Sequence, residues 1–393
     1  MAGMEGQRAR LELYIHIPLC VRKCRYCDFL SFSGVDDAQR RRYLAALEEE
    51  IRSAGDGHRQ AAVSSVFFGG GTPSLLTPDE VGHLMEVIRS SFAPEEDCEI
   101  TMECNPGTVT ADSLKEIRSA GIGRLSIGAQ SLREEELRTL GRIHDAQAVR
   151  NTWTWAAQAG FTNLSLDLMS GIPGQTKESW NRTLEETLAL DPAPKHISAY
   201  SLIVEEGTPF HELLREGKLE LPSEETDRAL YAATKEKLMK AGLARYEVSN
   251  YAVPGYECRH NLGYWTRVPY LGFGLGASSF YGERRWKNTS DPESYLRAPG
   301  RATEEEEVLS REDALSEELI LGLRLIRGVS VERIGKLYGV DLVTRYRDVL
   351  DRAFEAGLME IAEGADEDGG KAHFLRFTDA GLDVENSILC EFL

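Results

Sequence analysis

Residues 14–29, YIHIPLCVRKCRYCDF, decide the interpretation of this 393-residue chain, because three cysteines follow a short apolar segment directly. Cys20, Cys24 and Cys27 form a C-x3-C-x2-C pattern, and thiolates spaced this closely are typical of metal binding. Three cysteines without a fourth nearby suit a [4Fe–4S] cluster in which one iron stays open to an outside ligand.

The residues around the cysteines bear on the choice of metal. Arg22, Lys23 and Arg25 lie between the cysteines, where positive charge favours the deprotonated thiolate. The alternative is a structural zinc ion with His16 as its fourth ligand. Structural zinc sites usually combine two short pairs of ligands, and this segment has no second pair. An iron–sulfur cluster is therefore the prediction.

The rest of the composition limits the class of protein. The remaining cysteines are scattered singly, which predicts free thiols in a reducing compartment; they are Cys98, Cys104, Cys258 and Cys390. The first residues lack the apolar core of a secretory signal, and no apolar stretch approaches the roughly 18 residues of a membrane span. We therefore expect a cytoplasmic protein without a membrane span. The net charge of −19 disfavours nucleic acid as a partner.

Short apolar segments alternate with amphipathic helical segments through the first half of the chain. The expected strands are residues 11–17, 63–68, 98–104, 124–130, 163–169 and 196–203. Repeated strand–helix alternation predicts a parallel sheet with right-handed crossovers.

The faces of these strands indicate what kind of sheet they form. Residues 163–169, NLSLDLM, place leucine on one face and mainly polar side chains on the other. A sheet covered by helices on both faces would be apolar throughout, and an ordinary barrel has an apolar interior. We therefore predict an α/β fold with an incomplete parallel (β/α)6 barrel and a roomy, polar interior.

Two further features point to a ligand at the carboxyl ends of these strands, where α/β proteins collect their chemistry. Glu103, Gln130, Asp167 and Tyr200 are polar residues near strand ends, although any one of them alone could be an ordinary residue beside a loop. Residues 67–74, FFGGGTPS, contain three glycines whose N–H groups could bind a polar ligand. The segment lacks the Lys-Ser/Thr end of a P-loop.

Together these segments resemble the radical S-adenosylmethionine (SAM) superfamily. The similarity is greatest to the branch that contains oxygen-independent coproporphyrinogen III oxidases and HemW-type heme chaperones. The segments that carry it are YIHIPLCVRKCRYC (14–27), FFGGGTPS (67–74), ECNP (103–106), SIGAQS (126–131), LDLMSGIPGQT (166–176) and FTDAGLDVENSIL (377–389). The resemblance implies that each cysteine binds one iron and that SAM chelates the fourth. The reduced cluster would cleave SAM to methionine and a 5′-deoxyadenosyl radical.

The resemblance also implies a set of SAM contacts. They fall on Tyr14, Gly70, Gly71, Thr72, Glu103, Gln130, Arg142 and Asp167 of this chain. Tyr26 matches an aromatic position that could pack on the adenine ring, and Ser201 is a further candidate contact. No catalytic residue is assigned.

Two features separate the branches. The oxidases carry one more motif cysteine where this chain has Phe29, and the segment before residue 11 is too short for their N-terminal extension. The chaperones carry an H-N-x-x-Y-W motif, which is present here as His260–Trp265. We therefore expect His260, Tyr264 and Trp265 to contact heme, through imidazole ligation of iron and stacking of the aromatic rings. The alternative is that these side chains pack a core.

The second half of the chain is expected to form two more regions. We predict a barrel at residues 1–204, a lid or bridging region at 205–300 with an exposed acidic linker near 302–307, and a winged-helix-like domain at 301–393. By resemblance, the chain would be a heme chaperone that passes heme to hemoproteins, including respiratory-chain proteins, with a homodimer as one option for its assembly. The runner-up is a coproporphyrinogen oxidase or another radical SAM enzyme that modifies a tetrapyrrole.

Overall fold

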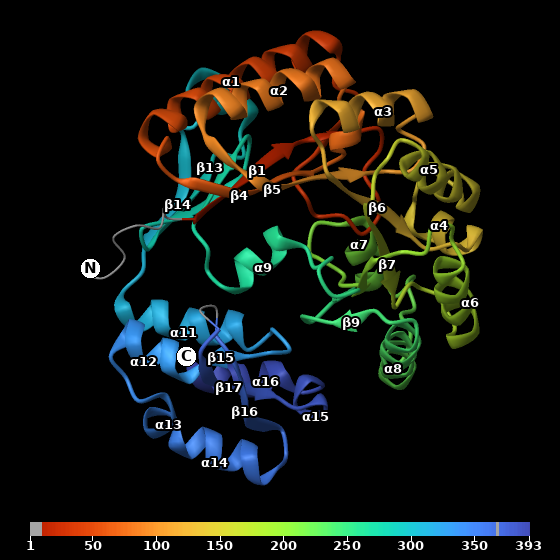
Figure 1. The fold of residues 1–393 in the computed structure, drawn as a ribbon. Helices are drawn as coiled ribbons and strands as arrows, with labels where there is room; N and C mark the ends of the chain where they lie inside the picture. The colour runs from red at the N-terminus through yellow and green to blue at the C-terminus, as the bar shows by residue number, and fades with distance from the viewer. Residues whose placement is uncertain (1–9, 367–368) are drawn as a thin grey trace.

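The computed structural model describes residues 10–366 and 369–393. Its centre is a curved sheet in which six parallel strands lie side by side in chain order (Figure 1). These are β1 (Arg10–Ile17), β4 (Ala62–Gly70), β5 (Ala93–Cys104), β6 (Arg124–Gln130), β7 (Asn163–Ser170) and β8 (His196–Ser201). The six predicted strands are confirmed.

The helices between these strands cover the outer face of the sheet (Figure 1). They are α1 (Asp37–His58), α2 (Pro78–Ser91), α3 (Ala111–Ala120), α4 (Glu134–Leu140), α5 (Ala146–Gln158) and α6 (Lys177–Leu188). Alternation along β7 explains this layering, because Leu166 and Leu168 are buried in the main hydrophobic core whereas Asp167 accepts a hydrogen bond from Ser126 of β6. The polar interior predicted from alternation is confirmed.

Residues 205–300, predicted to be a lid or bridging region, contain strands that extend the sheet at both edges. At one edge β11 (Tyr270–Phe273) runs parallel to β1 and is followed by antiparallel β12 (Ser278–Tyr281) and β13 (Arg284–Asn288). At the other edge lie β10 (Asn250–Ala252) and β9 (Ala244–Arg245). Within residues 10–366 and 369–393 no pairing joins the two edges, so the barrel is incomplete.

The predicted acidic linker is a strand, β14 (Thr303–Val308), at the outer edge of the sheet. Its side chains are exposed, as expected, but they face basic residues of β13. Glu306 pairs with Arg284 at 2.8 Å and Glu305 with Lys287 at 3.2 Å. Opposite charges across an antiparallel pair stabilise strand pairing, which the sequence of the acidic segment alone did not reveal.

The C-terminal part of the chain, residues 311–393, forms a separate module with its own hydrophobic core, which includes Leu319, Ile334, Leu350 and Leu375. Helices come first: α11 (Arg311–Gly322), α12 (Val331–Tyr338), α13 (Leu342–Arg345) and α14 (Arg347–Glu355). A hairpin of β16 (Met359–Ala365) and β17 (Lys371–Phe377) follows, with short β15 (Val329–Ser330) beside β17. Two short helices, α15 (Asp379–Leu382) and α16 (Glu385–Leu389), close the chain. The winged-helix-like order of elements is confirmed, and α13 and α14 meet at Tyr346.

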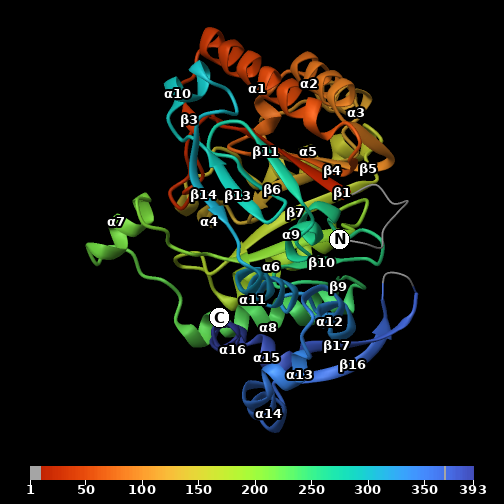
Figure 2. The same ribbon diagram turned by 90° about the vertical axis from the view of Figure 1, so that its left-hand side faces the viewer.

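Four other helices connect these parts. They are α7 (Pro209–Arg215), which projects from the body in Figure 2, α8 (Glu224–Lys240), α9 (Arg259–Trp265) and α10 (Pro292–Arg297). Just after α9, Arg267 ties the sheet to the C-terminal module, because its guanidinium pairs with Glu317 of α11 at 2.9 Å and donates to the Tyr338 hydroxyl at 3.0 Å. Among the described residues, no helix is long and apolar enough to cross a membrane.

Candidate functional site

The cysteine loop lies at the carboxyl end of β1. Its ends are joined by a two-strand parallel pair, β2 (Leu19–Cys20) and β3 (Phe32–Ser33). Its middle is fixed at Arg25, whose N–H donates to the Leu140 carbonyl and whose carbonyl accepts from the Phe210 N–H, both at 3.0 Å. Cys20, Cys24 and Cys27 are all partly exposed free thiols. Main-chain hydrogen bonds from distant segments therefore help to fix the loop.

The glycine turn after β4 contacts β1 and the cysteine loop closely. A Cβ atom on Gly71 would lie 2.6 Å from the Leu19 carbonyl oxygen, and Gly70 has a φ of 113° beside the ring of His16. The Gly70 N–H donates to Glu103 at 3.1 Å and the Gly71 N–H to the Ile17 carbonyl at 2.9 Å. Both N–H groups already have acceptors within the protein. The sequence predicts donors that are available to a polar ligand, whereas in the structure the two glycines allow close approach of the backbone.

A connected set of hydrogen bonds reaches two of the cysteine sulfurs. The Thr72 hydroxyl lies 3.5 Å from Cys20 Sγ and accepts from the Asn105 amide at 2.8 Å. The Arg142 guanidinium donates to Asn105 Oδ1 at 2.5 Å and to Cys24 Sγ at 3.5 Å. Donors aimed at sulfur suit thiolates, whose negative charge they offset. The sequence prediction included Thr72 and Arg142 but missed Asn105, although the ECNP segment contains it.

Two carboxyl groups lie on the interior face next to this set. Glu103 accepts from Gly70, and Asp167 accepts from the Ser126 hydroxyl at 3.0 Å. Burial raises the pKa of Glu103 to about 8, with a further contribution from the neighbouring Asp167 carboxylate. Burial likewise raises the pKa of Asp167, although hydrogen bonds from Ser198 and Ser126 oppose the shift. A cationic group in the interior would favour the ionised form of both side chains.

The other predicted SAM contacts line the same end of the barrel. Gln130 ends β6 with a φ of 65°, a left-handed conformation that ordinary side chains rarely adopt and that is frequent at functional sites. Tyr26 packs beside Phe210 and Met169 and lies next to the Arg142 guanidinium. Ser201 shares a hydrogen bond with Ser170 at 3.2 Å. The SAM roles of these residues stay predictions.

The surroundings of the cysteines bear on the choice between a cluster and a zinc ion. No three His, Cys, Asp or Glu side chains within residues 10–366 and 369–393 are placed to hold one metal ion. His16, the proposed fourth zinc ligand, has its Nδ1 3.2 Å from the Tyr14 hydroxyl and its Nε2 2.9 Å from the Leu30 carbonyl. A [4Fe–4S] cluster needs each cysteine at a different iron. His16 is thus engaged within the protein, which disfavours it as a zinc ligand, and the donors that face Cys20 and Cys24 suit cluster-bound thiolates. Cluster binding stays a prediction.

The motif predicted to contact heme lies elsewhere. His260 and Tyr264 of α9 are at the opposite end of the barrel from the cysteine loop, where His260 lies 2.8 Å from the Ser65 hydroxyl near the start of β4. His260 is only 1% exposed, whereas Trp265 is half-buried. This placement favours the packing alternative for His260. A heme contact by these residues stays a prediction.

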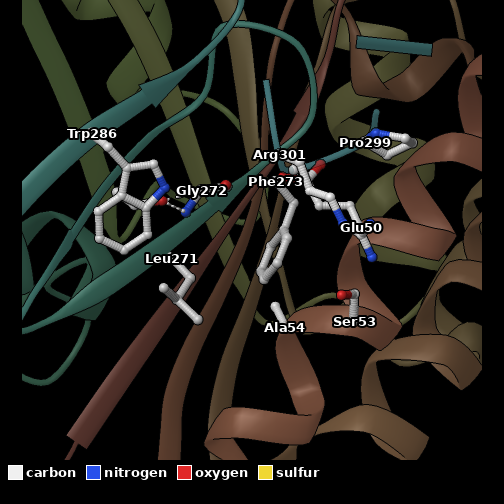
Figure 3. Close-up of a pocket in the computed structure, with 11 residues that line it drawn as sticks. Glu50, Ser53, Ala54, Leu271, Gly272, Phe273, Trp286, Pro299 and Arg301 are labelled. Carbon is white, nitrogen blue, oxygen red and sulfur yellow. Dashed lines mark hydrogen bonds between the residues drawn. The ribbon is translucent and has the colours of Figure 1, made fainter. Parts of the chain in front are cut away.

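Two cavities lie outside the cysteine site. One, of about 130 Å³, is formed between α1 and the β11–β13 edge by residues that include Glu50, Phe273, Trp286 and Arg301 (Figure 3). Its Glu50 carboxylate is fully occupied, since it accepts from the Gly274 N–H, Asn288 and Tyr295 at 2.6–2.8 Å. The other, of about 310 Å³, lies behind the cysteine loop and is lined by residues such as Leu19, Phe32 and Tyr43.

Comparison with known proteins agrees with this geometry. Residues 14–187 match the radical SAM superfamily and residues 309–365 match the HemN C-terminal domain. The chain is 37% identical to the heme chaperone HemW of Bacillus subtilis (strain 168), over 90% of this chain and 93% of that protein. It is 39% identical to the heme chaperone HemW of Escherichia coli (strain K12), over 68% of this chain and 69% of that protein.

The fold also matches the solved structure of coproporphyrinogen III oxidase (HemN) from Escherichia coli, a radical SAM enzyme. The TM-score is 0.82 over 98% of this chain and 90% of that one, at 24% sequence identity. That likeness concerns the fold alone, whereas the sequence similarity to the HemW proteins extends over both the barrel and the C-terminal module. The chain therefore belongs to the HemW family within the radical SAM superfamily.

Proposed function

We propose that this protein is a heme chaperone that binds heme and passes it to hemoproteins, on a scaffold that holds a [4Fe–4S] cluster and SAM. The similarity to the heme chaperone HemW of Bacillus subtilis, which spans 90% of the chain, carries the proposal. Phe29 supports it, because the oxidases have a further motif cysteine at this position and here the side chain is 59% exposed.

Different residues at the barrel mouth would hold the two cofactors. Cys20, Cys24 and Cys27 would bind the cluster, which when reduced supplies the electron for cleavage of SAM. Arg142 would offset thiolate charge at Cys24, which its guanidinium already faces at 3.5 Å. Glu103 and Asp167 would accept hydrogen bonds from the amino or ribose groups of SAM, because both carboxyl groups line the interior.

The remaining parts of the proposal concern the cargo and its destination. Heme would be transferred to recipient hemoproteins, among them respiratory-chain proteins, and the protein would act in the cytoplasm, with a homodimer as one form of assembly. The C-terminal module is the region we propose for contact with a recipient. Because the chain has a net charge of −19, nucleic acid is an unsuitable partner for this module.

A paired assay on anaerobically reconstituted protein tests the proposal. We expect the protein to bind heme, to release it to an apo-hemoprotein and to convert little or no coproporphyrinogen. The fold shared with coproporphyrinogen III oxidase makes oxidation the second candidate. Robust conversion of coproporphyrinogen to protoporphyrinogen, without heme transfer, would replace the first proposal by the second.

A further inference from the structure

Helix α9 closes the end of the barrel opposite the cysteine loop. In Figure 1 it lies between the central strands and the C-terminal module. The N–H groups of Arg259 and His260 both face one carboxylate oxygen of Glu99 in β5, at 3.0 and 3.4 Å. Gly263 lies so close to β1 that an added Cβ atom would be 2.1 Å from Glu12 Oε1. We call α9 and the strand residues that it contacts, Glu12, Ser65 and Glu99, the barrel floor.

The imidazole of His260 is fully engaged in this floor. Its Nδ1 lies 2.8 Å from the Ser65 hydroxyl and its Nε2 lies 3.0 Å from the Tyr264 hydroxyl. Burial lowers the pKa of His260 to about 3, so the ring is neutral and one nitrogen donates while the other accepts. Burial also raises the pKa of Glu12 to about 9, so its contact with His260 at 3.6 Å is not an ion pair near neutral pH.

His260 packs against two rings of the barrel interior, Phe67 and Tyr14, which are register partners on β4 and β1. The three rings lie nearly parallel, with His260 5.0 Å from Phe67 and 6.5 Å from Tyr14 between ring centroids, and we call them the stack. The interplanar angle between His260 and Phe67 is 21°, and Phe67 lies at 6.3 Å and 20° from Tyr14. Tyr264 also packs edge-on against His260, at 4.8 Å. Close packing of this kind fixes the position of the imidazole and of the Phe67 and Tyr14 rings that it contacts.

The Tyr14 ring of the stack contacts the elements that carry the cluster site. An added Cβ atom on Gly69 would lie 2.9 Å from the Tyr14 ring, so this ring packs directly under the glycine turn. The Tyr14 hydroxyl lies 3.2 Å from His16, and His16 reaches the Leu30 carbonyl at 2.9 Å, three residues after Cys27. Contacts therefore run without a break from α9 to the cysteine loop.

We propose that His260 is a positioning residue, which holds Phe67 and Tyr14 against the glycine turn and thereby sets the geometry of the SAM and cluster site from the barrel floor. The inference rests on the proposed function, because its test measures the affinity for SAM at the barrel mouth. It gives the 260–265 motif a role that needs no heme ligation by His260. Displacement of bound groups by a fraction of an ångström is enough to change binding measurably.

The test uses the full-length protein, reconstituted anaerobically, with three substitutions. His260→Ala removes the imidazole that packs on Phe67 and Tyr14, and His260→Gln keeps a group that can bond to Ser65 or Tyr264. Gly263→Ala pushes α9 away from Glu12 without changing the His260 side chain. Arg259→Ala is the matched control on α9, because its ion pair with Asp97 is exposed. The measurements are SAM affinity by equilibrium dialysis, the EPR spectrum of the reduced cluster and the absorption spectrum of bound heme.

We expect His260→Ala and Gly263→Ala to weaken SAM binding roughly tenfold, with partial recovery in His260→Gln and no change in Arg259→Ala. The heme spectrum should be the same in all four variants. SAM affinities within twofold of wild type in both His260→Ala and Gly263→Ala would overturn the inference. An altered heme spectrum in His260→Ala with unchanged SAM binding would also overturn it.

Two complications have defined outcomes. If His260→Ala does not hold iron, Phe67→Leu breaks the stack while leaving the hydrogen bonds of His260 in place, and it should show the same loss of SAM affinity. If wild-type protein binds a cluster but no SAM, the proposed SAM site is wrong and the inference is judged by EPR alone. It then requires a shifted cluster spectrum in His260→Ala and an unshifted one in Arg259→Ala.

Discussion

The floor and the mouth of the barrel are formed by the same strands, yet their polar side chains have different partners. At the floor, Ser65, His260 and Tyr264 bond to one another and are sealed by α9. At the mouth, Thr72 and Arg142 face cysteine sulfurs on a loop that stays partly exposed. At the floor these side chains thus bond within the protein, whereas at the mouth they are directed at a site for ligands.

This difference shows what alternation along a strand can and cannot reveal. A polar interior face indicates that something polar fills the barrel, but both ends give the same signal. Position along the strand separates them, since chemistry in βα folds gathers at carboxyl ends and the opposite end serves stability. Glu12 and Glu103, each on the interior face, are therefore expected to respond very differently to substitution.

The largest expected effect is loss of iron, and it should differ between cysteines at the mouth and a cysteine at the floor. Cys20→Ala, Cys24→Ala or Cys27→Ala should abolish the cluster, because each supplies the sole protein ligand of one iron. Cys258→Ala, at the start of α9, should leave iron content near wild type, since this buried thiol contacts Glu99 at 3.5 Å on the floor. Iron and sulfide analysis after anaerobic reconstitution measures both, and full retention in the Cys24 variant would refute the assignment.

The next effect concerns the interior carboxylates. Asp167→Ala and Glu103→Ala should each weaken SAM binding by about 1.5–3 kcal/mol, which is the typical free-energy contribution of a hydrogen bond to a charged group. Cluster content should stay unchanged, because neither carboxylate contacts a cysteine. Equilibrium dialysis gives the affinity, and wild-type affinity in both variants would remove these residues from the site.

A smaller effect follows from the raised pKa of Glu103. SAM carries a cationic sulfonium group and favours the carboxylate, so its affinity should rise as pH increases through about 8. The stability of the free protein should move the other way. The folded-state pKa lies above the usual 4.5, so the folded state binds the extra proton and loses stability as pH rises from about 4.5 to 8.

Glu103→Gln separates these two consequences. It should weaken SAM binding, flatten the pH dependence and raise the free energy of unfolding at pH 8 by on the order of 1 kcal/mol. Urea unfolding at pH 6 and pH 8, with and without SAM, measures all three quantities. A variant that keeps the wild-type pH slope would assign the titration to Asp167 instead.

The sequence predicted the features that are local and missed those that depend on distant segments. Six strands and the cysteine loop could be predicted because the alternation of apolar and polar residues and the spacing of the cysteines are both visible within short segments of sequence. The floor could not, because Ser65 and His260 are 195 residues apart. Asn105 was missed for a similar reason, since its role arises only where it bridges Thr72 and Arg142. The strand β14 was missed because its basic partners lie on β13.

The smallest expected effect lies at that edge strand, away from both ends of the barrel. Glu306→Ala removes an ion pair whose two side chains are about half exposed, and solvent screening makes such pairs weak, so the free energy of unfolding should fall by less than about 0.5 kcal/mol. Arg267→Ala is the informative contrast, because its side chain is 5% exposed and pairs with Glu317, Glu318 and Glu283. Removing one partner from a buried ion pair typically costs about 3–5 kcal/mol. Urea unfolding of both variants compares them directly, and a cost above about 1 kcal/mol for Glu306→Ala would mean that the acidic strand has a structural role beyond its exposed charge pairs.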